Sequence, residues 1–171
     1  MSDKPSIVSS AHLAADSRMS GLSELEFALI TCGNAFNRWV VRCAAAAEAQ
    51  DLTTLDVLVL HNVNHRARDK RLSEICFLLN VEDTHLVNYS LKKLQRFELV
   101  EGTRRGKEVI YRTSNAGREL CQRYRAVRES CLLDALLALG GPDNKELSTI
   151  AQTLRALTGL YDQAARSASS L

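Results

Sequence analysis

Apolar residues recur at three- and four-residue steps through most of the chain, which is the spacing of amphipathic helices. The first stripe follows Ser23 and comprises Leu25, Leu29, Cys32, Phe36, Trp39, Val40, Cys43 and Ala47. At residues 51–56 the sequence DLTTLD predicts a break and a new helix, with Thr53 as N-cap and Asp56 three residues later. This second helix carries Leu55, Leu58, Val59 and Val63 and ends in the polar, basic stretch 61–70.

Two short helices separated by a turn are predicted next. The first places Leu72, Ile75, Cys76 and Leu79 on one face, and residues 80–83 form the turn. Asp83 or Thr84 then caps a helix whose buried positions are Val87, Leu91 and Leu94. Two such helices joined by about four residues of turn make a helix-turn-helix unit.

After Phe97 the apolar period changes to two, which predicts strands. Leu99-Val100 and Val109-Ile110-Tyr111 flank the cationic segment Gly102–Lys107, so we expect a β-hairpin, or wing, directly after the helix-turn-helix. Ser114 caps a long helix to about Leu139, which Gly140-Gly-Pro-Asp143 ends. The last helix has a seam suited to packing on another helix, formed by Leu147, Ile150, Leu154, Leu157 and Tyr161, and residues 164–171 are expected to fray.

The charge of the chain is distributed unevenly. Its net charge is only +2, but residues 66–128 hold 15 Lys and Arg against 8 Asp and Glu, a net of +7. The remainder holds 7 against 12, a net of −5. We therefore expect the middle to bind a polyanion and the acidic, apolar flanks to bind each other in a two-fold dimer.

The helix from Thr84 is predicted to read DNA. With Val87, Leu91 and Leu94 inward, the outward residues are His85, Asn88, Tyr89, Lys92, Lys93 and Arg96. The second helix of a helix-turn-helix lies in the major groove, where its first residues reach base edges. Asn88 has the donor and acceptor that fit adenine, and the later Lys92, Lys93 and Arg96 suit phosphates. The alternative is a solvated face that needs charge only for solubility.

The hairpin tip carries Arg104, Arg105 and Lys107, which we expect to contact the DNA backbone or a groove edge. The alternative is that these charges protect an exposed strand edge from pairing. The loop before the helix-turn-helix also carries cations. They would suit contacts that clamp the DNA backbone and an ordinary solvated loop equally well; these cations are Arg66, Arg68, Lys70 and Arg71.

The order of elements resembles the multiple antibiotic resistance regulator (MarR) family of winged-helix transcription factors. The resemblance rests on segments 52–58, 72–81, 94–100 and 113–120, in which LTTLDVL is similar to the family's LTxxxxxL and TSNAGREL to its LTxxGxxL. The chain has Glu98 where the family usually has glycine, and its wing lacks the usual Asp-x-Arg signature. A PadR-like or other winged-helix relationship is the alternative.

The resemblance implies a fold that is mostly α with a small β-hairpin wing, a winged helix-turn-helix flanked by N- and C-terminal dimerisation helices. The predicted parts are a flexible arm (1–22), an N-terminal dimerisation helix (23–50), a DNA-binding lobe (51–113) and C-terminal dimerisation helices (114–171). It also implies a small aromatic or lipophilic effector. Phe36, Trp39, Arg42 and His61 are the candidate ligand-binding residues, and ordinary core packing is the alternative for the two aromatics.

Other chemistry finds little support in the sequence. The five cysteines form no CxxC pair, so we expect free thiols that pack as small hydrophobes, although some MarR-like repressors sense peroxides through a thiolate. We expect no catalytic residue, no cofactor and no metal, since His61 and His65 lack a third ligand. The absence of a signal peptide pattern or an 18-residue apolar run predicts a soluble cytoplasmic protein with no membrane partner.

The sequence thus predicts a dimeric, sequence-specific DNA-binding transcription regulator and not an enzyme. The resemblance implies a ligand-responsive repressor that occupies a palindromic operator on double-stranded DNA. The alternatives are a winged-helix protein-interaction module and a non-specific architectural DNA binder.

Overall fold

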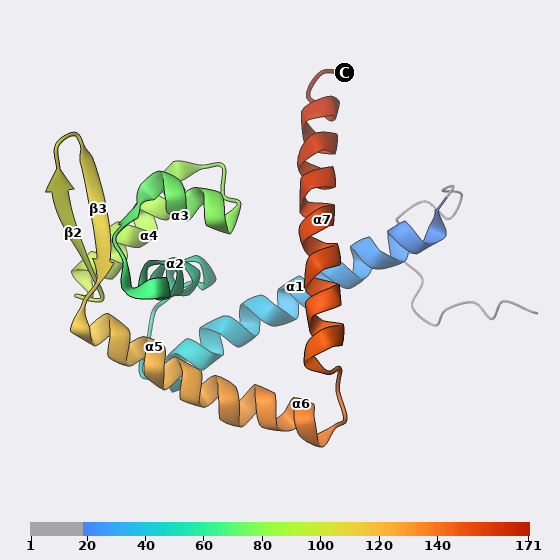
Figure 1. Ribbon diagram of the computed structural model, residues 1–171, viewed down its shortest axis with the longest axis horizontal. Helices are drawn as coiled ribbons and strands as arrows, with labels where there is room; N and C mark the ends of the chain where they lie inside the picture. Colours follow the sequence, from blue (N-terminus) through green and yellow to red (C-terminus); the bar gives the residue numbers. More distant parts are fainter. Residues whose placement is uncertain (1–18) are drawn as a thin grey trace, which may run out of the picture. The chain divides into compact units, whose positions relative to one another are not determined.

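The predicted order of helices and hairpin is present in the computed structural model, which describes residues 19–171 (Figure 1). The chain divides into two compact units, one up to Val127 and one from Arg128 to Leu171. The elements of the first unit are α1 (Ser20–Ala46), α2 (Thr54–Asn64), a 3-10 turn (His65–Ala67), β1 (Lys70–Arg71), α3 (Leu72–Leu79), α4 (Thr84–Arg96), β2 (Val100–Arg105), β3 (Glu108–Thr113) and α5 (Asn115–Arg128). The predicted fold class, mostly α with a small wing, is confirmed.

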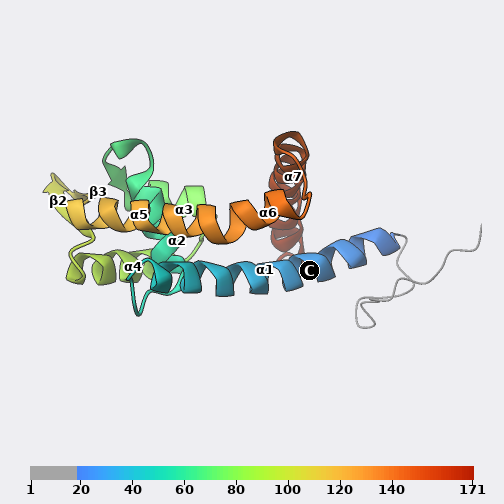
Figure 2. The ribbon, with the colours of Figure 1, turned by 90° about the horizontal axis from the view of Figure 1, so that it is seen from below.

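The core of the first unit surrounds α2, which packs against α1, α3, α4 and β3. On α4 the three predicted core residues Val87, Leu91 and Leu94 are fully buried. Burying a side chain of this size stabilises a fold by about 1.5–3 kcal/mol, so these residues fix which face of α4 turns outward. The C-terminal end of α1 meets α5 (Figure 2), where Nε of Arg123 donates to the carbonyl of Ala47 at 3.0 Å.

Side chains cap the helices where the sequence predicts them. Thr53 and Asp56 form a reciprocal capping box at the start of α2, and Asp83 accepts a hydrogen bond from the amide of His85 at the start of α4. Ser114 accepts from the amide of Gly117 at 3.0 Å in the first turn of α5. These bonds satisfy amides that have no partner within their own helix.

The sheet has three antiparallel strands in the order β1-β3-β2. The hairpin pairs Arg105 with Glu108, and Gly106 between them has a φ of 63°, which fits a two-residue type II′ turn. The third strand was not predicted: Lys70 pairs with Tyr111, and its side chain is only 1% exposed. The interpretation of residues 66–71 as a loop is therefore wrong for β1, whose two residues are too few to show a period.

The glycine of the TSNAGREL motif, Gly117, lies where the backbone packs too closely for any side chain. A Cβ at this position would overlap the backbone carbonyl of Leu99 and press on the side chain of Thr113. The amide of Ser114 also donates to that carbonyl at 3.1 Å, so α5 starts in direct contact with the turn that leads into the wing. Only glycine allows this approach.

Glu98, the residue that departs from the family's glycine, has a φ of 58°, in the left-handed region that disfavours side chains. Replacing it by glycine should therefore raise the free energy of unfolding by about 0.5–1 kcal/mol, after the greater flexibility of the unfolded chain is subtracted. Urea unfolding measures the change. The matched variant Glu119→Gly, at an exposed helical position of α5, should instead lose about 1 kcal/mol. A loss of stability in Glu98→Gly would contradict the prediction.

The second unit contains a π-helical segment (Glu129–Leu133), α6 (Asp134–Ala138) and α7 (Asn144–Ala168). A single regular helix to Leu139 was predicted, so the π segment is a departure. Asp143 and Glu146 form a capping box at the start of α7. The helix continues to Ala168, so the prediction that it frays from Ala164 is wrong.

Large apolar side chains remain exposed on both units. On α1 the predicted stripe is buried only in its second half: Val40 and Cys43 are buried, whereas Phe36 is 50% exposed. In α7 no residue is buried, and Ile150 and Leu154 are 51% and 39% exposed. Exposed apolar surface on this scale is typical of an interface with another chain. α1 begins at Ser20, inside the predicted arm 1–22, and residues 1–18 of that arm lie outside the described residues.

Candidate nucleic-acid interface

Helix α4 packs beside strand β2 of the wing (Figure 1), and its outward face presents polar and aromatic side chains. His85, Lys92 and Arg96 are exposed, and Tyr89 is 66% exposed. Asn88 is half-buried and lines a hollow of about 370 Å³, together with Arg71, Leu72, Ser73, Glu108, Val109 and Tyr111. The start of α3, the middle of α4 and strand β3 therefore meet around Asn88.

The wing cations are exposed, and one of them is held by an acidic residue that sequence reasoning missed. Asp69 pairs with Arg105 at 3.2 Å and with Arg112 at 2.8 Å. Nε of Arg104 donates to the carbonyl of Gly106 at 3.3 Å across the turn. Exposed ion pairs stabilise by at most about 1 kcal/mol, so phosphate oxygens can replace Asp69 as the partner of Arg105 at little cost.

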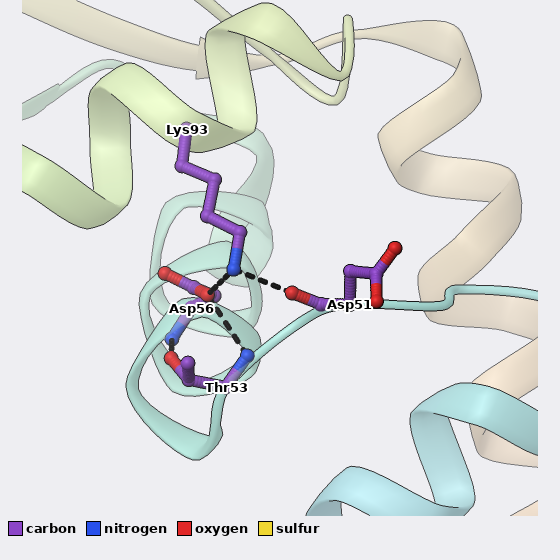
Figure 3. A network of polar contacts seen from close by, with 4 residues as sticks. All are labelled: Asp51, Thr53, Asp56 and Lys93. Carbon is purple, nitrogen blue, oxygen red and sulfur yellow. Dashed lines mark hydrogen bonds and ion pairs between the residues drawn. The ribbon is translucent and has the colours of Figure 1, made fainter.

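The side chain of Lys93 points toward Asp56 of α2 (Figure 3), whereas its neighbour Lys92 is exposed. Its ammonium lies 2.8 Å from Oδ2 of Asp56 and also donates to the carbonyl of Asp51. The prediction that Lys93 faces outward is therefore wrong in geometry. The signal that could have revealed it is Asp56, an acidic residue at the N3 position of a helix that is otherwise apolar on its inner face.

Asp56 is a buried carboxylate whose side chain is 2% exposed. Burial raises the pKa of this carboxyl, but hydrogen bonds from Lys93, the backbone of Thr53 and the hydroxyl of Ser90 outweigh it and leave the pKa below its ordinary value of 3.8. Asp56 is thus charged at neutral pH and holds Lys93 against α2.

The substitution Asp56→Asn should cost on the order of 3 kcal/mol of folding free energy at neutral pH, because it leaves a largely buried ammonium without its counter-charge. The folded pKa is depressed, so the wild type loses this advantage as the pH falls below about 4 and the carboxylate is protonated. Urea unfolding of both proteins at about pH 7, 5 and 3 measures the difference. A difference that stays constant down to about pH 3 would contradict the assignment.

The cations before α3 have separate environments. Arg68 pairs with Glu74, and the hydrogen bond from Arg68 lowers the pKa of that carboxyl. The ammonium of buried Lys70 lies 3.6 Å from Glu74. Arg71 pairs with Glu108 of the wing at 3.2 Å, and Arg66 is exposed. Of the four, Lys70 is thus removed from any surface role.

Comparison with known proteins agrees with this geometry. Residues 52–117 match the family model described as winged helix DNA-binding domain. Solved structures are similar over most of the chain. A transcriptional regulator (MarR family) from Rhodococcus sp. RHA1 has a TM-score of 0.65 at 15% identity, over 82% of this chain and 96% of its own. FabT from Streptococcus pneumoniae in complex with DNA has a TM-score of 0.62 at 16% identity, over 84% and 99%.

A mutant MarR from E. coli complexed with operator DNA has a TM-score of 0.58 at 18% identity, over 80% of this chain and 97% of its own. The chain has the MarR-type winged-helix fold. A comparison of the sequence with curated proteins found no match. The MarR-type resemblance drawn from the sequence is thus confirmed for the fold, with α3 and α4 as the helix-turn-helix and β2–β3 as the wing.

The predicted ligand-binding residues have different environments. Phe36 and Arg42 are exposed on α1, whereas Trp39 packs against the core. The ring of His61 packs edge-on against Tyr124, with 4.6 Å between centroids. Burial lowers the pKa of His61, so its imidazole is neutral at pH 7 and supplies no positive charge to a carboxylate.

A hollow that sequence reasoning missed lies where the α1–α2 linker meets α4, the turn into the wing and α5. Its volume is about 350 Å³. Its lining residues are Glu48, Ala49, Gln50, Asp51, Leu52, Phe97, Leu99, Leu120 and Arg123. The walls come from distant parts of the sequence, so no local pattern could have revealed it.

The five cysteines are free thiols, as predicted. Cys43, Cys76 and Cys121 are buried, and burial raises the pKa of Cys121 to about 11. Cys32 and Cys131 are exposed. The expectation that they pack as small hydrophobes is therefore wrong for the single, isolated chain. Within residues 19–171, no three His, Cys, Asp or Glu side chains are grouped to hold a metal ion, and no helix is long and apolar enough to span a membrane.

Proposed function

We propose that this protein is a cytoplasmic, dimeric, sequence-specific DNA-binding transcription regulator of the MarR type, and not an enzyme. The observation that carries the proposal is the combination of an exposed polar face on α4 with an exposed cationic wing on the same winged helix. In this arrangement α4 enters the major groove and the wing contacts the backbone beside it. His85, Asn88 and Tyr89 face the bases, while Lys92, Arg96, Arg104, Arg105 and Lys107 face phosphates.

Dimerisation is supported by the exposed apolar residues of α1 and α7 and by the net negative charge of the chain outside residues 66–128. One reading helix contacts only a few base pairs, so two copies related by a two-fold axis gain specificity from two half-sites one helical turn apart. The operator is therefore a palindrome on double-stranded DNA.

The regulator is a repressor that leaves its operator when a small aromatic or lipophilic effector binds. Such release requires the effector to bind more tightly to a dimer whose reading helices are wrongly spaced. Phe36, Trp39 and Arg42 on α1, with His61 on α2, remain the proposed ligand-binding residues. His61 serves there as a neutral hydrogen-bonding group, in keeping with its lowered pKa.

The substitution Asn88→Ala tests the reading helix. It should relax the preference for one base pair in each half-site, at a cost of about 1–3 kcal/mol per copy on the preferred site. Duplexes selected from a random pool by the wild type and the variant measure the preference. His65→Ala, an exposed change outside α4 and the wing, is the matched control and should leave the selected sequence unchanged. An unchanged sequence with Asn88→Ala would exclude this asparagine as a base contact.

Gel shifts with a library of duplexes, run over a series of salt concentrations, separate the proposal from its two rivals. Palindromic sequences enriched in the shifted band support a sequence-specific regulator. Uniform binding to every duplex supports an architectural DNA binder, because phosphate contacts carry no sequence information. A protein that shifts no duplex at low salt is a protein-interaction module.

A further inference from the structure

The reading helix α4 is tied to the first turn of α2 by side chains that face away from the proposed DNA surface. We propose that Lys93 is a positioning residue for base reading: through Asp56 and Asp51 it fixes the rotation of α4, and it does not contact DNA. The inference rests on the proposed function, because it concerns how α4 is held for reading.

The attachment point on α4 is Lys93, whose side chain is 14% exposed and whose ammonium donates to the carboxylate of Asp56. Ser90 is three residues earlier on the same face of the helix, is 2% exposed, and its side chain contributes to the lowered pKa of Asp56. The Lys93–Asp56 pair therefore holds this face of α4 against α2. The distance from Nζ of Lys93 to Oδ2 of Asp56 is 2.8 Å (Figure 3).

The acceptor side is itself fixed. The amide of Thr53 donates to Oδ2 of Asp56 at 2.8 Å, and the amide of Asp56 donates to Oγ1 of Thr53 at 3.3 Å. The carbonyl of Asp51, which also accepts from Lys93, belongs to a residue with a φ of 65° in the linker from α1. The ammonium therefore joins α4, the cap of α2 and the α1–α2 linker at one point.

This attachment affects base contacts more than phosphate contacts. Side-chain tips on α4 lie about 5–6 Å from the helix axis, so a rotation of about 10° moves them by about 1 Å. A hydrogen bond to a base edge does not tolerate this shift, since its distance range is only about 2.7–3.2 Å. The long side chains of Lys92 and Arg96 adjust to it and keep their phosphates. Loss of the Lys93 ammonium thus lowers specific binding while non-specific binding persists.

The test compares Lys93→Met with Lys92→Met in full-length protein. Binding to a duplex selected by the wild type and to a duplex of unrelated sequence is measured by fluorescence anisotropy over a salt series. Lys93→Met should lower the ratio of specific to non-specific affinity by about 10-fold, which is the size of a base-pair mismatch, and leave the salt slope unchanged. Lys92→Met should weaken both duplexes alike and reduce the slope by about 0.9 for each bound copy.

Two further variants make the test independent of stability. Val57→Ala removes buried methyl groups from α2 without touching the ion pair, so it should lower the melting temperature and keep the specificity ratio. The double variant Asp56→Asn/Lys93→Met leaves no charge unpaired and should fold, with the same low ratio as Lys93→Met.

Three results would overturn the inference. The first is a salt slope that falls in Lys93→Met as it does in Lys92→Met, which would make Lys93 a phosphate contact. The second is a ratio that falls equally in Val57→Ala, and the third is a ratio that stays at the wild-type value in both Lys93 variants. A wild type that binds no duplex contradicts the proposed function itself, and the inference falls with it.

Discussion

Replacing Lys92 and Arg104 together by methionine should weaken DNA binding by about 10³–10⁴-fold at roughly 0.1 M salt, for selected and unrelated duplexes alike. Lys92 is exposed on α4 and Arg104 is exposed in the wing, so each copy loses one phosphate contact from each surface. Two copies lose four contacts in all. Each contact contributes about 0.9 to the slope of log affinity against log salt, so the slope should fall by about 3.6.

The size of that change also reports how many copies bind. A fall of about 1.8 would indicate that a single copy grips the duplex. Lys145→Met, which removes an exposed cation at the start of α7, is the matched control and should leave the slope unchanged. If the double variant kept the wild-type slope, the surface formed by α4 and the wing would not be the one that binds phosphate.

The substitutions Ile150→Asp and Leu154→Asp, made together, should convert the dimer into a monomer and reduce affinity for the selected palindrome by at least about 10³-fold. Both side chains are apolar and exposed on α7, where two carboxylates per chain would have to be desolvated to form an interface. Binding to unrelated duplexes should change much less, because one winged helix keeps its own phosphate contacts. Sedimentation velocity and fluorescence anisotropy measure the two effects.

Gln152→Asp is the control for this pair. Gln152 is exposed on the opposite side of α7, so the same charge there should leave the dimer intact. If the doubly substituted protein remained dimeric, α7 would not be the dimerisation surface. A wild-type monomer at micromolar concentration would exclude the dimer altogether.

Sequence reasoning succeeded where the determinants are local. The apolar spacing predicts a helix over residues 72–79, and α3 spans Leu72–Leu79. The change of period after Phe97 predicts the wing, and Gly106 forms its turn. Thr53, Asp83 and Ser114 cap the helices that they precede, because an N-cap acts within three residues of itself.

Sequence reasoning failed where the partner is distant. Lys92 and Lys93 look equivalent in the sequence, but Asp56, 37 residues earlier, draws only Lys93 inward. Lys70 looks like one cation of a basic loop, yet its pairing with Tyr111 of β3 buries it. Cys32 lies on the apolar stripe of α1 but is exposed. An apolar stripe in the sequence does not indicate whether residues of the same chain or of another chain will bury it.

Selection of duplexes from a random pool by the wild-type protein, at about 0.15 M salt, tests the central claim most directly. Two copies of α4 reading two half-sites predict an enriched sequence with two-fold symmetry, whose half-sites are centred about 10–10.5 base pairs apart or a multiple of that. The enriched sequence should shift as a complex of two protein chains with one duplex. A pool that shows no enriched sequence, or a site without two-fold symmetry bound by one chain, would contradict the account.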